Sequence, residues 1–180
     1  MAIERSLFLE IVKDAYSAYY SIVPEAEAGD LPLAFRADYK SRDESYFFVK
    51  SANIWGNEKN EYTYVFSAPR IDAETAKRCI DWAWQDMLPK VKPHKEHQYT
   101  NCKVVFIADA VPEETAAAVK ETKASKSYGF MSLQGYSELI TAIVDLGTEK
   151  TVTNQVGRGM EKFFHKLFAL RHEEALSKWE

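Results

Sequence analysis

The apolar stretches CKVVFIA (residues 102–108) and ELITAIVDL (residues 138–146) decide the fold class. Neither stretch alternates apolar with polar residues, as a strand with one solvent-facing side would. Short, continuous apolar runs are typical of strands in the middle of a sheet with both faces covered. We therefore expect helices on both faces of a mixed sheet, which is a three-layer α/β/α sandwich.

Helices are predicted on either side of the first of these strands. Asp72 is placed as an N-cap and Glu74 lies in the first turn, so a helix should run to about residue 88. Its inward stripe at helical spacing is Ala76, Cys79, Ile80, Ala83, Trp84 and Met87. Pro112 suits the first position of the next helix, over residues 113–124.

Two further helices are predicted at the ends of the chain. Residues 4–20 have one apolar face, and Pro24 stops the element; the positions on that face are Phe8, Ile11, Val12, Ala15, Tyr16 and Tyr19. The last helix should start near Gly159, and one of its faces carries Met160, Phe163, Phe164, Leu167, Phe168 and Arg171. Both helices are available to cover one face of the sheet.

The segment between the first two helices has strand character. Residues 33–40 alternate with a period of two, residues 46–55 are rich in aromatic residues, and residues 61–68 resume the pattern after a break at 56–57. We expect a three-stranded antiparallel meander here, at the start of the mixed sheet. A further strand is predicted at residues 128–133, turned by Gly135, and residues 151–159 have no dominant period. These elements form one α/β domain over residues 1–180.

Composition and charge narrow the classes of function. The chain has 23 basic and 27 acidic residues, and residues 1–32 hold two basic against six acidic ones, so the remainder is balanced. A nucleic-acid binder usually carries a broad basic surface, so nucleic acid is an unlikely partner. The clusters at residues 90–103 and 120–126 are interpreted as solvated lysines. No run is apolar enough to span a membrane, and we expect a cytoplasmic protein with no membrane association.

The sequence carries no strong catalytic signature. Cys79 and Cys102 are too few for a disulfide framework, and neither adjoins a group that must lower its pKa, so both are predicted core residues. Lys103 should point away from Cys102, to the opposite strand face. The glycines of Gly157-Arg158-Gly159 could hold an anion at a helix start, but a flexible connection is the interpretation we favour.

A metal site is an alternative at one segment. His94 and His97 are spaced so that both imidazoles reach one metal if the segment is helical, and Glu96 could add an oxygen ligand. Zn²⁺ is the ion such a set would hold. A polar loop without a cofactor is the competing interpretation, since a site needs at least three ligands.

The order helix, three strands, helix and strand resembles the core of the restriction-endonuclease-like family. That family holds Mg²⁺ between an acidic residue on one meander strand and an acidic-x-Lys triplet on the next. Asp38 matches the first acid and Glu61 the second, but Thr63 stands where the lysine is required. The segments PHKEHQY (93–99) and SLQGY (132–136) also resemble an uncharacterised group of small bacterial and archaeal proteins, which implies no activity.

Aromatic residues in the expected meander favour a binding function. They are too many for one buried face, and period two puts the last three on one side; the set is Tyr39, Tyr46, Phe47, Phe48, Trp55, Tyr62, Tyr64 and Phe66. An uncovered part of this face would contact a protein partner or a second copy. We therefore expect a non-catalytic α/β domain that acts through protein binding or self-association, with a degenerate or intact Mg²⁺-dependent nuclease-like protein as the alternative.

Overall fold

The structure, a computed structural model, describes residues 3–24, 28–42 and 58–177, with the backbone alone at 41–42 and 171–177. The helices in these ranges are α1 (Arg5–Ser17), α2 (Ala73–Met87), α3 (Glu113–Glu121) and α4 (Arg158–Ser177). The strands are β1 (Ser21–Val23), β2 (Leu33–Arg42), β3 (Glu58–Arg70), β4 (His97–Ala110), β5 (Ser125–Ser127), β6 (Tyr136–Asp145) and β7 (Lys150–Thr153). Single 3-10 turns occupy Leu88–Lys90, Phe130–Ser132 and Gln155–Gly157.

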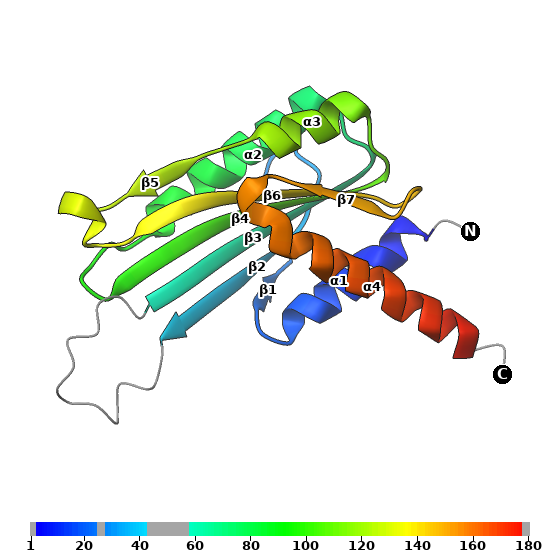
Figure 1. The fold of residues 1–180 in the computed structure, drawn as a ribbon, viewed down its shortest axis with the longest axis horizontal. Coiled ribbons are helices and arrows are strands. Elements are labelled where there is room, and N and C mark those ends of the chain that lie inside the picture. The colour runs from blue at the N-terminus through cyan, green and yellow to red at the C-terminus, as the bar shows by residue number, and fades with distance from the viewer. Residues whose placement is uncertain (1–2, 25–27, 43–57, 178–180) are drawn as a thin grey trace.

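The described residues form one mixed sheet of seven strands, six of which follow the order β1-β2-β3-β4-β6-β5, while β7 also pairs with β6 (Figure 1). Strands β1, β2 and β3 are antiparallel, whereas β3, β4 and β6 run parallel. The two short strands β5 and β7 both pair with β6, one with its first half and one with its second. The parallel centre contains both apolar runs that predicted the fold class.

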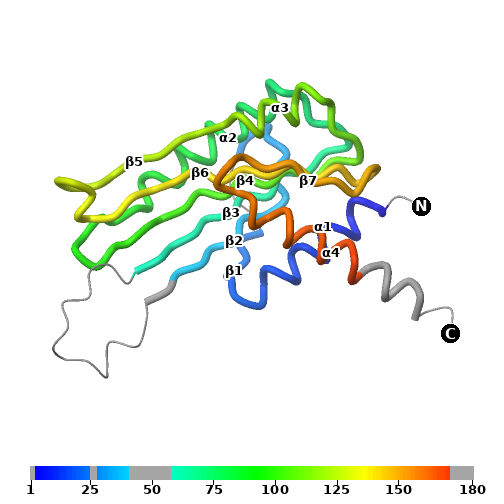
Figure 2. Tube along the Cα trace, viewed as in Figure 1, coloured from blue at the N-terminus to red at the C-terminus, as the bar shows by residue number. Residues whose placement is uncertain are grey.

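Helices cover both faces of the sheet, so the predicted three-layer sandwich is confirmed. Helices α2 and α3 lie on one face and α1 and α4 on the other (Figures 1 and 2). On the α1/α4 face, Phe8 of α1 stacks on Phe168 of α4 with ring centroids 4.7 Å apart. One apolar cluster is buried between the sheet and α1/α4, and a second between the sheet and α2/α3. The burial of these two clusters is the main favourable contribution to the free energy that holds the layers together.

The two helices predicted in most detail form largely as expected. Asp72 caps α2 by accepting a hydrogen bond from the Thr75 backbone N–H at 2.7 Å. All the predicted inward residues of α2 are buried except Trp84, which is half-buried. In α4 the buried residues are Met160, Phe164, Leu167 and Phe168; Phe163 packs at the edge, and the side chain of Arg171 lies outside the described residues.

The first helix and the meander differ from the prediction. Helix α1 ends at Ser17 because the carbonyl of Tyr16 accepts hydrogen bonds from the N–H groups of both Tyr19 and Tyr20, which turns the chain into β1. Tyr19, predicted to be on the apolar face, is therefore exposed. Strand β2 pairs directly with β3, and residues 46–55, predicted as the middle strand of the meander, lie outside the described residues.

The segment after α3 is also different. The predicted strand at residues 128–133 is wrong: the strand there is Ser125–Ser127, and Phe130–Ser132 forms a 3-10 turn. Strand β4 begins at His97, within a stretch expected to be a polar loop. Among the described helices, none combines the length and the apolar character needed to cross a membrane.

Candidate binding surface

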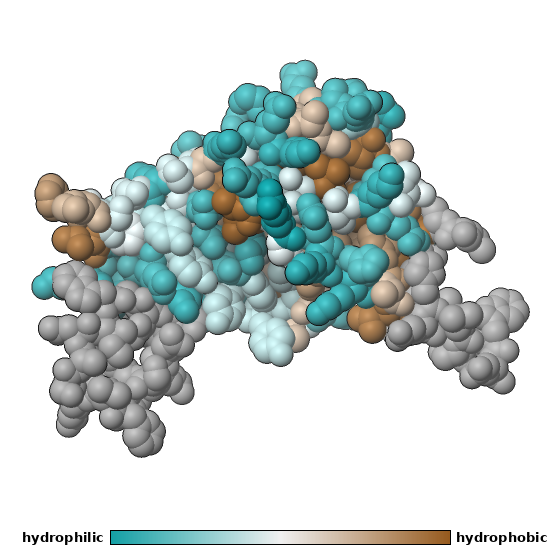
Figure 3. Space-filling view, in the orientation of Figure 1, coloured by the Kyte–Doolittle hydropathy of each residue, from teal (hydrophilic) through white to brown (hydrophobic). Residues whose placement is uncertain are grey.

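The connection between β5 and β6, residues 128–135, is called the β5–β6 tip here, and it presents large apolar side chains to water. Phe130, Met131 and Leu133 are 81%, 80% and 49% exposed. They form the apolar patch at the far end of the molecule from both termini (Figures 1 and 3). Single exposed hydrophobic residues are ordinary, but a contiguous group on one turn marks an interaction site.

The backbone of the tip is held in an unfavourable conformation. Met131 and Ser132 have φ angles of 50° and 59°, a left-handed region that costs a non-glycine residue about 1–2 kcal/mol. The tip is closed by backbone hydrogen bonds from Tyr128 N to Gly135 O at 2.9 Å and from Gln134 N to Tyr128 O at 3.1 Å. Strain of this kind persists only where surrounding contacts fix the conformation, and it is concentrated at functional sites.

His97 provides those surrounding contacts. It is 2% exposed, and its Nδ1 lies 2.7 Å from the carbonyl oxygen of Gln134. Because a carbonyl only accepts hydrogen bonds, Nδ1 carries the proton and donates. Nε2 lies 2.8 Å from the Thr100 hydroxyl, and the ring meets Tyr128 edge-on with centroids 5.9 Å apart. A buried imidazole therefore fixes the base of the tip.

Gly135 makes this close approach possible. Its φ is +82°, and a Cβ at this position would lie 2.6 Å from the backbone oxygens of both His97 and Gln98. Only glycine fits. The structure thus brings residues 93–99 and 132–136, the two segments that resemble an uncharacterised group, into direct contact at one end of the sheet.

The predicted metal ligands His94 and His97 lie near one another, with ring centroids 6.2 Å apart, but their ring nitrogens are engaged by other groups. Both ring nitrogens of His97 are in hydrogen bonds, whereas Nε2 of His94 faces the Glu58 carboxylate at 3.1 Å. Nδ1 of His94 accepts from the backbone N–H of Glu96, so that residue contacts His94 through its main chain. In the described ranges no three His, Cys, Asp or Glu side chains are grouped as metal ligands.

A pocket of about 500 Å³ lies between α1, the start of α4 and the sheet, and is called the Tyr20 pocket here. Its walls are mainly aromatic and aliphatic: Ala15, Tyr16, Tyr19, Tyr20, Ile140, Val156, Met160 and Phe163. Asn154 fixes the adjoining start of α4, since its side-chain oxygen accepts from the N–H groups of Thr141 and Gly157. Gly157 is needed for this close packing rather than for chain flexibility.

The charged groups in the Tyr20 pocket neutralise each other. Lys103 Nζ lies 2.5 Å from Glu61 Oε2, which also accepts a hydrogen bond from the Tyr20 hydroxyl. Burial, together with the Glu61 contact, raises the pKa of Tyr20 far above its usual value. Tyr20 therefore stays a protonated donor and does not act as a base. The Tyr20 pocket can therefore accept an apolar group without leaving an unpaired charge.

The two acids expected in a nuclease-like site lie on opposite faces of the sheet. In the β2–β3 register Asp38 is paired with Tyr62, and Glu61 with Tyr39. Since side chains alternate along a strand, Asp38 points toward α2 while Glu61 points into the Tyr20 pocket. The two carboxylates cannot hold one Mg²⁺ between them in this arrangement.

Asp38 instead belongs to a structural ion-pair network. Its carboxylate binds the Arg36 guanidinium through two hydrogen bonds, of 2.7 and 2.9 Å. Arg36 lies 3.7 Å from Asp86, which also receives hydrogen bonds from Tyr64 and Lys90. Burial alone would raise the pKa of Asp86, but these partners outweigh burial and lower it. The network joins β2 and β3 to α2.

The cysteines are core residues, as predicted. Both are free and fully buried. Burial raises the pKa of Cys79 to about 12, and burial raises that of Cys102 further. Neither thiol is a nucleophile at neutral pH, because the thiolate is the reactive form. Lys103 points to the face opposite Cys102, which also confirms the sequence prediction.

Two expectations about exposed surface need correction. Tyr62, Tyr64 and Phe66 do not form an open aromatic face, because α2 covers them and Trp82 meets Tyr64 edge-on. The other meander aromatics between residues 43 and 57 lie outside the described ranges. Within the 90–103 cluster, Lys90 and Lys103 are part-buried in ion pairs, whereas Lys92 and Lys95 are exposed as predicted, like the lysines at 120, 123 and 126.

Residues 4–166 match the family model of a domain of unknown function, DUF8052. The chain belongs to the DUF8052 family. Neither the curated proteins nor the solved structures contain a match to it. The DUF8052 match contains both segments that meet at the β5–β6 tip, and it ends within α4. The restriction-endonuclease-like resemblance of this DUF8052 chain stays a prediction from element order.

Sequence reasoning missed the residues that stand out most in this DUF8052 domain. Phe130, Met131 and Leu133 were interpreted as part of a strand, although Gly129 and Gly135 bracket them and could have indicated a turn. For Lys103 the sequence predicts only that it faces away from Cys102, because the two are neighbours on one strand. Its pairing with Glu61 depends on the parallel register of β3 and β4, which no local pattern predicts.

Proposed function

We propose that this DUF8052 domain is a non-catalytic, cytoplasmic protein-binding module whose β5–β6 tip contacts the partner. The observation that carries the proposal is the exposure of Phe130 and Met131 on a backbone strained at Met131 and Ser132. Exposed apolar side chains gain free energy when a partner removes them from water. A pre-ordered tip also loses little conformational entropy on binding, which favours affinity.

The chemistry of the remaining polar groups supports a binding role. Asp38 and Asp86 are engaged in the ion-pair network, Glu61 is paired with Lys103, and both thiols are buried. Each of these carboxylates already has a structural partner, and neither thiol is accessible to a substrate. The two free cysteines are in keeping with a reducing compartment such as the cytoplasm.

Site-specific photocrosslinking in cells tests the proposal. A photoreactive phenylalanine analogue in place of Phe130 should form a covalent adduct with a protein, whereas the same analogue at Thr148, in the exposed turn at the other end of β6, should not. The adduct should disappear when Met131 and Leu133 are both replaced by serine. Equal labelling from the two positions, or no protein adduct from Phe130, would contradict a binding role for the tip.

A further inference from the structure

We propose that the partner of the tip is a second copy of this chain, and that the β5–β6 tip of each protomer fills the Tyr20 pocket of the other. This inference rests on the proposed function, because it assigns the occupant of the same tip. The contact is reciprocal, so it closes into a two-fold symmetric dimer without leaving an unsatisfied surface.

The two surfaces are chemically matched. The tip offers a phenylalanine, a methionine and a leucine, and the pocket offers aliphatic and aromatic walls from Ile140, Met160 and Phe163. The Glu61–Lys103 pair at its base is already compensated, with side chains 13% and 17% exposed. An apolar group can therefore enter without stripping water from a lone charge, which would cost several kcal/mol.

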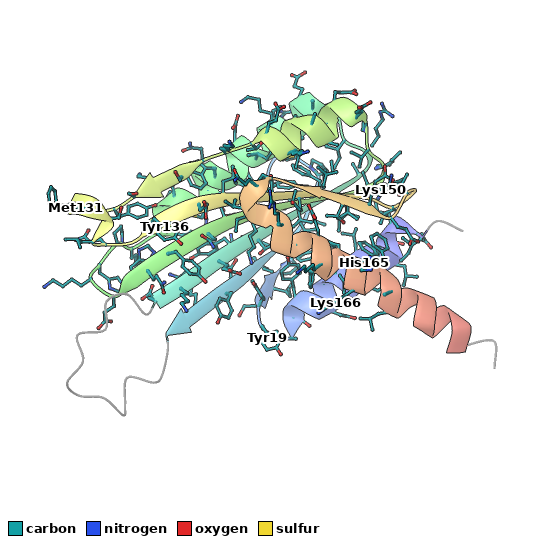
Figure 4. The ribbon with its side chains drawn as sticks, viewed as in Figure 1. Tyr19, Met131, Tyr136, Lys150, His165 and Lys166 are labelled. Carbon is teal, nitrogen blue, oxygen red and sulfur yellow. The ribbon has the colours of Figure 1, made fainter. Side chains whose placement is uncertain are left out.

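One face of β6 leads from the base of the tip to the pocket. Tyr136, at the base of the tip, and Ile140, in the pocket wall, are four residues apart on one strand, so their side chains share a face. At the rise of a β-strand this separation is about 13 Å. In Figure 4 the described helices leave the sheet uncovered between Met131 at the tip and the α1/α4 end, where Tyr19 lies. One approaching molecule can reach both surfaces.

The area available reaches that of a specific interface when both contacts form. A large aromatic side chain buries on the order of 150–250 Å² when fully covered, and a methionine or leucine somewhat less. The three tip residues are already partly covered, so one tip and the pocket wall that it meets remove roughly 500 Å² from water. Two reciprocal contacts therefore bury roughly 1,000 Å², the smallest area expected of a specific interface, which one contact alone does not reach.

Analytical ultracentrifugation of the full chain tests the dimer. The tip variant Phe130→Ser/Met131→Ser and the pocket-rim variant Tyr19→Ser/Val156→Asp alter exposed residues, so both should fold, which circular dichroism checks. Each should raise the dimer dissociation constant at least tenfold. Leu170→Ser, at an exposed position in neither surface, is the matched control and should leave the constant unchanged.

Mixing the two variants gives a sharper result. The tip variant keeps its pocket and the pocket variant keeps its tip, so a heterodimer retains one of the two contacts. The mixture should therefore associate more tightly than either variant alone. The proposal is overturned if the parent protein is monomeric at 10–100 times its concentration in cells. It is also overturned if the tip variant still forms the dimer. A Phe130 adduct with a different protein would overturn the dimer but leave the proposed function standing.

Discussion

Strand β6 has a turn at each end, and the two turns differ in their side chains and in the residues that support them. The β6–β7 turn, residues 145–150, is polar and is organised by a residue of its own: Asp145 accepts hydrogen bonds from the N–H of Thr148 within the turn and from the N–H of Val111 after β4. The β5–β6 tip is apolar and supported from outside, by His97 of β4. Each turn contains a left-handed non-glycine residue, Glu149 in one and Met131 in the other.

The difference shows that the apolar content of the tip is not a requirement of reversing the chain. A left-handed position at one end of β6 carries a glutamate, so the same backbone conformation is compatible with a charged side chain. At the other end the same conformation carries an exposed methionine beside an exposed phenylalanine. The side chains of the tip are therefore separable from the fold, and four substitutions test this separation.

Gly135→Ala should have the largest effect on stability. A Cβ would force a left-handed alanine against the backbone oxygens of His97 and Gln98, so we expect a loss of about 3 kcal/mol or more in the free energy of unfolding. Urea denaturation measures it. Gly147→Ala in the opposite turn is the control: its Cβ would meet Asp109 O at 3.0 Å without a positive φ, and the loss should be clearly smaller. Equal losses would mean that the tip is not tightly seated.

His97→Ala should cost about 2 kcal/mol, because the part-buried carbonyl of Gln134 and the buried hydroxyl of Thr100 both lose their hydrogen bond to the imidazole. Hydrogen exchange should then show faster opening of the amides of Tyr128 and Gln134, which close the tip. Asp145→Ala, which removes the polar support at the other end of β6, should accelerate exchange at Thr148 instead. If both His97→Ala and Asp145→Ala accelerate amide exchange at both ends of β6, the two turns open together.

Met131→Gly should raise the free energy of unfolding slightly, by about 0.5 kcal/mol. Relief of the left-handed backbone, about 1–2 kcal/mol, outweighs the greater flexibility of glycine in the unfolded chain. Glu149→Gly is the corresponding substitution in the other turn, where the same relief is offset by the loss of contacts made by Glu149, so we expect a smaller gain. We expect association to weaken only for the first variant. A destabilised Met131→Gly protein would show that the methionine side chain contributes to the fold.

Phe130→Ser should have the smallest effect on stability, within about 0.5 kcal/mol of the parent, because the ring is exposed. Phe164→Ala, which removes a fully buried ring from α4, is the contrasting variant and should cost about 3–5 kcal/mol. Thermal unfolding distinguishes them. A substantial loss for Phe130→Ser would place the ring in the core and remove the basis of the proposed function.

The layers of the fold were predictable from sequence because their signals are local. Apolar runs such as residues 102–108, and the helical stripe of α2, depend on periodicity alone. Gly129 and Gly135 could have indicated the turn of the tip, but the contacts made by the candidate residues were not predictable, because they depend on strand register. Asp38 and Glu61 lie on opposite faces of the sheet because of the register between β2 and β3, and a shift of this register by one residue would place them on the same face. The contact between His97 and Gln134 joins residues 37 apart, and no local pattern marks it.

The support of the tip by His97 also has a consequence for the order of folding. His97 begins β4 and Gln134 precedes β6, and these parallel strands are connected through α3 and β5, so the tip is completed only after a long-range pairing has formed. A chain that has collapsed without pairing β4 and β6 lacks the ordered tip. Under the proposed function, binding through the tip would therefore select fully folded molecules, and a bound partner would add to the free energy of unfolding by mass action.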